Sequence, residues 1–139
     1  MKKIFKITFI IFFFSNSIYA KTPYLQEGIN LFKNKKFKKA QFKFEKDIVF
    51  NPRSELSYLY LSKIFKNLDK KALQEQNLNT VILLNPKNEE AIFTLAKLKL
   101  KNSDYKKSKE LNDKLKSLCI NFCDESKKLK LEIENLLKK

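Results

Sequence analysis

Two short stretches, IVFNP at residues 48–52 and ILLNP at residues 82–86, decide the fold that this sequence predicts. Each joins a run of large apolar residues to an Asn-Pro dipeptide, and proline stops a helix because it lacks a backbone N–H donor. From Asn51 to Asn85 the period is about 34 residues, which is typical of arrays in which each repeat is a pair of antiparallel helices.

Apolar residues recur at helical spacing on both sides of these dipeptides and divide the chain into three units. The units run from about residue 22 to 52, from 53 to 86 and from 87 to 119, and each contains two helical segments. One glycine and three prolines in 139 residues are too few for the turns of a sheet built from hairpins. The sequence therefore predicts an all-α fold of three helix-turn-helix units.

Small residues mark the same helical position in all three units. Gly28 is the only glycine of the chain, and Ser62 and Ala96 follow it at the period of the Asn-Pro dipeptides. A glycine inside a helix costs about 1 kcal/mol relative to alanine, so we expect Gly28 to allow a close approach of the next helix. In that next helix we expect small Ala40 to face the first helix and Phe44 to fill the gap beside it.

The second unit departs from the pattern of the first around its inner turn. Gln74 stands where the first unit has Ala40, and Ala72 lies two residues earlier. This arrangement predicts an inner turn that is shifted by about two residues in the second unit.

The array is expected to end after the third unit, because Cys119 and Ile120 replace the closing Asn-Pro dipeptide. Residues 124–138 form a further amphipathic segment, whose apolar stripe consists of Leu129, Ile133, Leu136 and Leu137. A terminal repeat must cover its open apolar face, so we interpret this segment as a capping helix. A basic helix that lies on a membrane surface is the alternative.

The first unit resembles the tetratricopeptide repeat (TPR) family, and the two later units match that family in part. The residues that carry the resemblance in the first unit are Tyr24, Gly28, Leu31, Phe37, Ala40, Phe44 and Pro52. Because three units are in phase at one period, the resemblance extends over residues 22–119. It implies a right-handed α-solenoid with a concave, protein-binding face, and it implies no catalysis.

In the TPR family the first helix of each pair lines the concave groove. Carried onto this sequence, the resemblance gives the candidate groove residues Leu25, Ile29, Phe32, Leu59, Lys63, Lys66, Phe93 and Lys97. Apolar side chains mixed with ammonium groups would suit an extended or helical peptide of partly acidic character. Alternatively, Leu25, Ile29 and Phe32 pack against the N-terminal segment or a neighbouring subunit.

One subtype of the family grips a C-terminal carboxylate with Lys, Asn and Arg side chains of these helices. The corresponding positions hold no cation here, since they are Leu25, Ile29, Tyr60, Glu90 and Thr94. The sequence therefore does not support that mode of binding.

The chain is strongly basic, with a net charge of +15. Such a charge favours an anionic partner, for example lipid headgroups or a cell-wall polymer. Only Arg53 is an arginine, whereas sites for phosphate usually employ the planar guanidinium group. We therefore do not expect nucleic acid as a partner, while an anionic envelope surface remains an alternative.

Residues 1–20 have the layout of a secretory signal peptide, with three lysines before an apolar run from Ile7 to Phe14. The run is far shorter than the roughly 20 residues that span a bilayer. We expect cleavage after Ala20, which leaves a TPR domain of residues 21–139 in the periplasm or cell envelope. Cleavage after Ser17 and retention as a short anchor are the alternatives.

We expect neither catalysis nor a bound metal or cofactor. The chain has no histidine, which removes most zinc sites and histidine-assisted nucleophiles. Glu89 and Glu90 are expected on a solvated helix surface. Cys119 and Cys123, the only cysteines, flank the start of the capping helix, and export favours a disulfide between them over two reduced thiols.

The function that these observations predict is a non-enzymatic adaptor, which binds a protein or peptide in its concave groove within the cell envelope. A lysine-rich protein that binds anionic lipid or wall polymer is one alternative. A structural subunit of an envelope complex is another.

Overall fold

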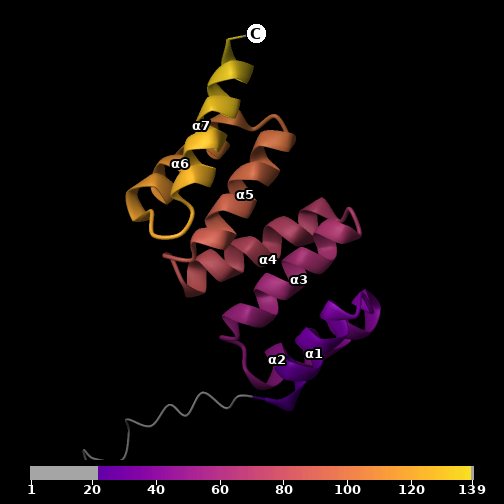
Figure 1. Cartoon of the computed structure of the whole chain (residues 1–139). Helices are drawn as coiled ribbons and strands as arrows, with labels where there is room; N and C mark the ends of the chain where they lie inside the picture. Colours follow the sequence, from indigo (N-terminus) through magenta and orange to yellow (C-terminus); the bar gives the residue numbers. More distant parts are fainter. Residues whose placement is uncertain (1–21, 139) are drawn as a thin grey trace, which may run out of the picture.

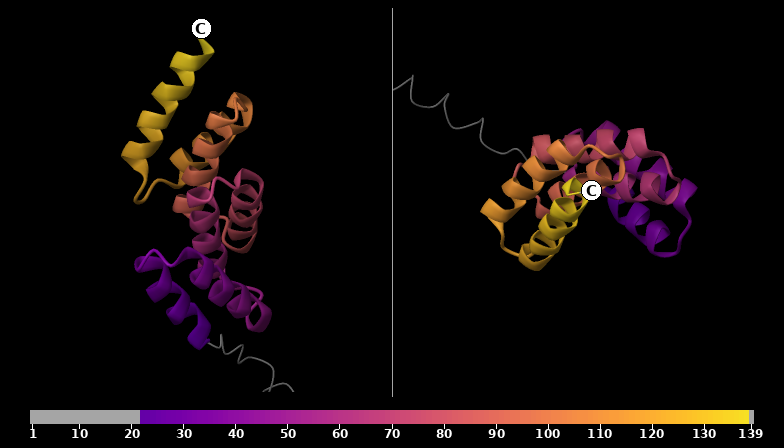
Figure 2. Two further views of the ribbon diagram at one scale, coloured as in Figure 1. Left: turned by 90° about the vertical axis from the view of Figure 1, so that its right-hand side faces the viewer. Right: turned by 90° about the horizontal axis from the view of Figure 1, so that it is seen from above.

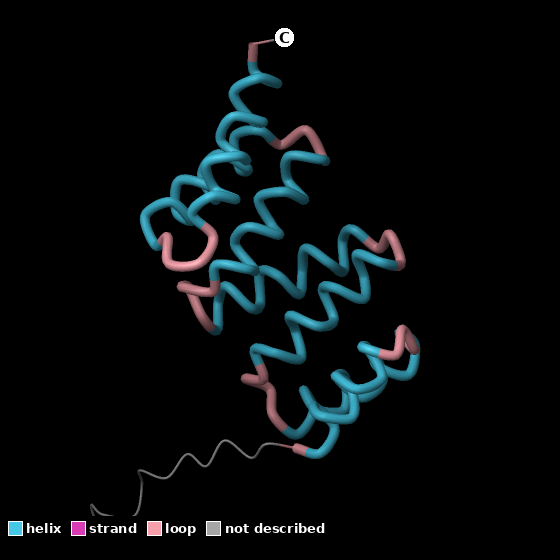
Figure 3. Tube along the Cα trace, viewed as in Figure 1, coloured by secondary structure: helices cyan, strands magenta, loops and turns pink. Residues whose placement is uncertain are grey.

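The computed structural model describes residues 22–138, so the predicted signal peptide and its cleavage site lie outside the described residues. This part of the chain contains seven helices and no strand, as the sequence predicted (Figure 1). The helices are α1 (Pro23–Lys33), α2 (Phe37–Phe50), α3 (Glu55–Asn67), α4 (Lys71–Leu84), α5 (Glu89–Lys101), α6 (Tyr105–Leu118) and α7 (Cys123–Leu137). Short loops join them into antiparallel pairs (Figure 3).

The inner turn of each pair has the same geometry in all three units. One residue of each turn is left-handed, namely Lys35 at φ 56°, Asp69 at φ 52° and Ser103 at φ 60°. The amide that follows donates to a carbonyl five residues earlier, as from Lys70 N to Phe65 O at 2.8 Å. These bonds satisfy carbonyl groups that the end of a helix leaves unpaired. The turns therefore recur at the period of the repeat without interruption.

The predicted shift of the inner turn in the second unit is wrong. Gln74 is only 5% exposed and occupies the inward position that Ala40 holds in the first unit, whereas Ala72 is exposed. The reason is that the backbone of the turn fixes where the next helix begins. The turn therefore determines which position of α4 faces inward, whatever residue occupies it. The flexible side chain of Gln74 fits at that position.

The units stack into a solenoid that curves around their first helices. Among helices that are not consecutive in the chain, α1 contacts α3 and α5 contacts α7. Because the first helices of the units approach one another, they lie on the inner side of the curve. Figure 2 shows the resulting arch, with α1 and α2 at one end and α7 at the other. This arrangement is an all-α helical repeat solenoid, as the sequence predicted.

Two separate clusters of buried apolar side chains hold the stack together. The first cluster consists of Ala40, Phe44, Leu61, Ile64 and Phe65. The second cluster is larger and extends from Leu59 in α3 to Ile133 in α7. Helix α3 contributes side chains to both clusters, so it joins the first unit to the rest of the array.

The last helix stands in the register of a fourth unit. Cys123 begins α7 one full repeat period after Glu89, which begins α5. Leu129 and Ile133 are buried against the preceding unit, as expected of a capping helix. Leu136 and Leu137 are exposed, so the predicted apolar stripe is used only in its first half. These two positions correspond to turn residues of the third unit, beyond the last core position of a first helix.

None of the helices between residues 22 and 138 combines the length and the apolar character needed to cross a membrane. Nor do these residues gather three or more His, Cys, Asp or Glu side chains into a group that could hold a metal ion.

Candidate binding groove

Two adjacent hollows lie along the inner side of the solenoid. The first, of about 310 Å³, lies between α1, α3 and α5 and is lined by Phe32, Leu59, Ser62, Lys63, Lys66, Asn67, Glu90 and Thr94. The second, of about 430 Å³, is lined by Lys66, Asp69, Lys71, Gln74, Phe93, Thr94, Lys97, Leu98 and Lys101. Because Lys66 and Thr94 belong to both, the hollows form one surface, which we call the inner groove.

The structure brings six of the eight predicted groove residues to the inner groove. They are Phe32, Leu59, Lys63, Lys66, Phe93 and Lys97. Leu25 and Ile29 line neither hollow and instead pack against the first core cluster. The alternative prediction named the N-terminal segment or a neighbouring subunit as the partner of these residues, and the N-terminal segment lies outside the described residues.

The apolar members of the inner groove are buried or half-buried. Leu59 is 5% exposed and belongs to the second core cluster. The ring of Phe32 packs edge-on against Tyr60, with ring centroids 5.1 Å apart. The ring of Phe93 lies 5.5 Å from that of Phe122. These contacts hold the aromatic rings in fixed orientations, so the groove is largely formed before any ligand arrives.

Two of the predicted groove lysines are paired with carboxylates. Lys63 Nζ lies 2.8 Å from Glu90 Oε1, which joins α3 to α5. Lys97 Nζ lies 2.8 Å from Glu132 Oε2, which joins α5 to α7. Sequence reasoning missed both pairs because the partners lie on different helices. Exposed pairs of this kind contribute at most about 1 kcal/mol to stability, so their ammonium groups are still accessible to a competing anion.

The unpaired positive charge of the inner groove lines its second hollow. Among residues 22–138, no carboxylate oxygen forms an ion pair with the ammonium group of Lys66, Lys71 or Lys101. All three side chains are exposed and line the second hollow, which also contains the carboxylate of Asp69. An acidic side chain of a ligand would find unpaired cations here beside the edge of Phe93.

Carboxylates at the first position of two first helices hold successive units together. Glu55 accepts hydrogen bonds from Asn85 Nδ2 at 3.0 Å and from Asn88 Nδ2 at 2.5 Å, in the loop that enters the third unit. Glu89 stands at the equivalent position of the next unit. This recurrence at one helical position is the signal that sequence reasoning could have used.

The expectation that Glu89 lies on a solvated surface is wrong, since it is only 8% exposed. Its carboxylate accepts hydrogen bonds from the amides of Ile120 at 2.5 Å, Asn121 at 2.7 Å and Phe122 at 3.1 Å. The bonds from Ile120 and Asn121 lower the pKa of the Glu89 carboxyl, although burial opposes them. Glu89 therefore fixes the loop that leads into α7.

The two cysteines lie in the same loop. A disulfide joins Cys119, at the end of α6, to Cys123, at the start of α7, with Cα atoms 5.0 Å apart. The loop is thus held at its ends by the disulfide and in its middle by Glu89.

No family model matches this sequence, and no curated protein matches it either. Solved structures do match its fold. The first TPR domain of Spaghetti (RPAP3) is 18% identical, with 84% of this chain and 91% of that chain covered and a TM-score of 0.74. The type III secretion chaperone SycD of Yersinia enterocolitica is 16% identical, with 84% and 92% covered and a TM-score of 0.73.

The TPR2B domain of yeast Sti1 is similar to the same extent. It is 14% identical, the match covers 83% of this chain and 99% of that chain, and the TM-score is 0.74. All three matches span most of both chains at low sequence identity, so they establish architecture rather than shared residues. The chain has the fold of TPR domains.

Proposed function

We propose that this protein is a non-enzymatic adaptor that holds a segment of another protein in its inner groove. The observation that carries the proposal is the surface formed by the two joined hollows, where unpaired Lys66 and Lys101 lie beside the edges of fixed aromatic rings. Domains of the same fold support it. The Spaghetti domain is bound to an HSP90 peptide, SycD to a peptide of the translocator YopD, and the Sti1 domain to an Hsp70 partner.

The chemistry of the inner groove narrows the kind of segment that fits. Unpaired ammonium groups favour acidic side chains, and the edges of Phe32 and Phe93 favour apolar ones. The positions from which TPR domains grip a C-terminal carboxylate carry no cation here. We therefore propose an internal segment with acidic and apolar side chains, rather than a free C-terminus.

We further propose that the adaptor works outside the cytoplasm, in the periplasm or cell envelope. The layout of residues 1–20 supports export. A disulfide between Cys119 and Cys123 also supports it, because disulfides persist in oxidising compartments and are rare in the cytosol.

A capture experiment with two matched variants tests the proposal. Residues 21–139 are immobilised, exposed to envelope extract and washed at low and high salt. Lys66→Glu with Lys101→Glu reverses the free charge of the groove at two exposed positions. Lys106→Glu with Lys109→Glu is the control with the same change in net charge, because these lysines are exposed on α6 and line neither hollow.

We expect a discrete protein that survives the high-salt wash, that the groove variant fails to capture and that the control variant retains. Circular dichroism must show unchanged helix content in both variants. Capture that is equal for all three proteins would contradict the proposal, and so would material that is heterogeneous and released by salt alone.

A further inference from the structure

The outer face of α2 combines exposed apolar side chains with lysines. Phe42 is 54% exposed, Val49 75% and Phe50 65%, although all three are large and apolar. At about 100° per residue, Phe42 and Val49 lie at the centre of the solvent side of the helix. We call this surface the α2 outer face, and it consists of Lys38, Lys39, Phe42, Lys46, Val49 and Phe50.

The fold itself does not require this composition, as the two later units demonstrate. In α4 the positions equivalent to Lys38, Phe42, Lys46 and Val49 hold Ala72, Gln76, Thr80 and Leu83, without any lysine. In α6 they hold Lys106, Glu110, Lys114 and Ser117, and Leu118, the equivalent of Phe50, is half-buried against the second core cluster. Among the second helices of the three units, only α2 combines lysines with exposed large apolar side chains on this side.

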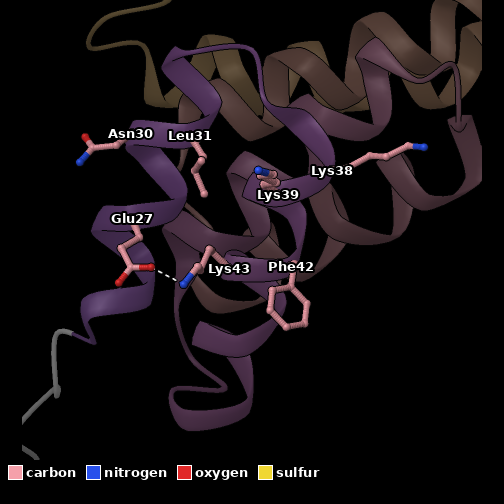
Figure 4. Close-up of a pocket in the computed structure, with 7 residues that line it drawn as sticks. All are labelled: Glu27, Asn30, Leu31, Lys38, Lys39, Phe42 and Lys43. Atoms are coloured by element: carbon pink, nitrogen blue, oxygen red, sulfur yellow. Dashed lines mark ion pairs between the residues drawn. The ribbon is translucent and has the colours of Figure 1, made fainter.

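A hollow of about 690 Å³ adjoins the α2 outer face (Figure 4). Leu31 and Phe42 provide its apolar lining, and Lys38 and Lys39 stand around it. Figure 4 also shows the ion pair between Glu27 and Lys43 at one side of the hollow. The hollow lies at the end of the array where, among residues 22–138, no unit precedes α1. Its lining thus mixes apolar side chains with charged ones.

Contacts within the α2 outer face hold its lysines close to its rings. Lys46 Nζ lies 4.6 Å from the centroid of the Phe42 ring and 5.5 Å from that of Tyr24. The Tyr24 ring in turn stacks on Phe50, with centroids 5.6 Å apart. The carboxylate that α2 adds to this side, Glu45, accepts a hydrogen bond from Gln41. The face therefore carries excess positive charge directly beside exposed apolar groups.

We propose that the α2 outer face docks on an anionic phospholipid surface. Phe42 and Val49 enter the boundary between headgroups and acyl chains, as the apolar side of an interfacial helix does. Lys38, Lys39 and Lys46 bury their stems beside them and place their ammonium groups at the lipid phosphates. A phosphate polymer would use the lysines alone, whereas a bilayer also accounts for the exposed phenylalanine and valine.

Vesicle sedimentation of residues 21–139 tests the proposal. This piece contains every residue of the seven helices and their two core clusters, and circular dichroism before use confirms that it is folded. Vesicles of equal parts phosphatidylglycerol and phosphatidylcholine are compared with phosphatidylcholine alone. We expect binding to the first and little to the second. Equal binding to both, or to neither, overturns the proposal.

Charge-matched variants locate the surface. Lys38→Gln, Lys39→Gln and Lys46→Gln together remove three charges from the α2 outer face, and each lysine near such a membrane is worth about a fivefold change in binding. We therefore expect a loss on the order of 100-fold. The control carries Lys106→Gln, Lys107→Gln and Lys114→Gln at the equivalent positions of α6. An equal loss of binding in the control overturns the proposal, because binding would then depend on the net charge of the protein and not on the α2 outer face.

A fluorescence experiment tests the apolar contact separately. The chain has no tryptophan, so Phe42→Trp supplies a single probe on the α2 outer face, and Leu83→Trp supplies one on the outer side of α4. We expect anionic vesicles to shift the emission of the first probe to the blue and to leave the second unchanged. Shifts of both probes, or of neither, contradict the proposal. So does a blue shift without vesicles that rises with protein concentration, because a second copy would then cover the face.

Discussion

Gly28 lies so close to the ring of Phe44 that a Cβ atom at residue 28 would come within 2.7 Å of Cε1 and 2.9 Å of Cδ1. The ring is fully buried and stacks on Tyr60, with centroids 5.0 Å apart, so it has little room to withdraw. The packing of α1 on α2 therefore requires a residue without a side chain at this position. The close approach that the sequence predicted from a lone glycine is confirmed.

Gly28→Ala should lower the free energy of unfolding. Alanine favours the helix by about 1 kcal/mol, but overpacking a filled core costs about 1–3 kcal/mol. We expect the clash to exceed the gain and to leave a net loss of about 1 kcal/mol, measured by urea unfolding. Gln26→Ala, at an exposed position of the same helix, is the control and should not destabilise. A Gly28→Ala protein as stable as the parent would falsify the explanation.

The ring can be tested as the cause in a double-mutant cycle. Phe44→Leu removes the Cε1 and Cζ atoms that a Cβ at residue 28 would meet. The two substitutions together should then cost less than the sum of their separate effects. Additive costs would mean that Gly28 is needed for another reason.

Glu89→Gln should lower the stability of the folded protein at neutral pH and have little effect on it in acid. The pKa of Glu89 is lowered in the folded protein from an ordinary value of 4.5, chiefly by the Ile120 and Asn121 amides. The unfolded chain therefore takes up the proton first as the pH falls. The stabilisation from Glu89 is complete above pH 4.5 and disappears as the pH falls through the lowered pKa.

Thermal unfolding between pH 7 and pH 3 measures this difference. The variant should be less stable than the parent at pH 7, and the two curves should converge below pH 4.5. Glu90→Gln is the neighbouring control, because its carboxylate is half-exposed and accepts no backbone hydrogen bond from the loop of residues 119–122. A constant difference in stability at every pH would show that the negative charge of Glu89 is not what holds the loop.

Removing the disulfide should loosen α7 without unfolding the array. Cys119 and Cys123 are close in sequence, so the bond closes a short loop and contributes at most about 2–3 kcal/mol. Glu89 still holds the middle of that loop when the bond is absent. We expect Cys119→Ser with Cys123→Ser to leave the helix content intact and to speed proteolytic cleavage after residue 118. If cleavage is as slow as in the parent, the disulfide does not retain α7.

Lys35→Gly should stabilise the protein. Lys35 is left-handed at φ 56°, a conformation that costs a residue with a Cβ about 1–2 kcal/mol. Glycine avoids that cost but adds about 0.4–1 kcal/mol of entropy to the unfolded chain. We expect a net gain of about 0.5–1 kcal/mol in denaturant unfolding. Gln76→Gly, in the middle of α4, should instead destabilise. A loss of stability with both substitutions would contradict the explanation that the left-handed conformation of Lys35 costs free energy.

The fold was predictable because its information is periodic and local. Asn51-Pro52 and Asn85-Pro86 stop successive units, and the apolar spacing identifies the helices between them. The prediction failed at Gln74, where residue type was taken as a guide to register. The left-handed backbone conformation of Asp69 sets that register, and the aspartate side chain does not indicate this conformation in the sequence.

The inner groove was predictable only in part. Positions such as Lys66 and Phe93 follow from the repeat, since the period fixes which side of a first helix faces inward. The burial of Leu59 and the pairing of Lys63 with Glu90 do not follow, because both depend on contacts between units. The role of Glu89 could have been suspected from Glu55 at the equivalent position, but its burial depends on the course of the loop that donates to it.

The division of the core at α3 means that heat or denaturant need not unfold this chain in one step. Phe44 belongs to one cluster and Leu115 to the other, with no shared buried side chain between the clusters. Arrays of this kind are stabilised unit by unit, by each unit and its nearest neighbours. The first helix pair can then open while α3 to α7 stay folded, and its amides would exchange with solvent sooner. Two melting temperatures, not one, would then describe the molecule.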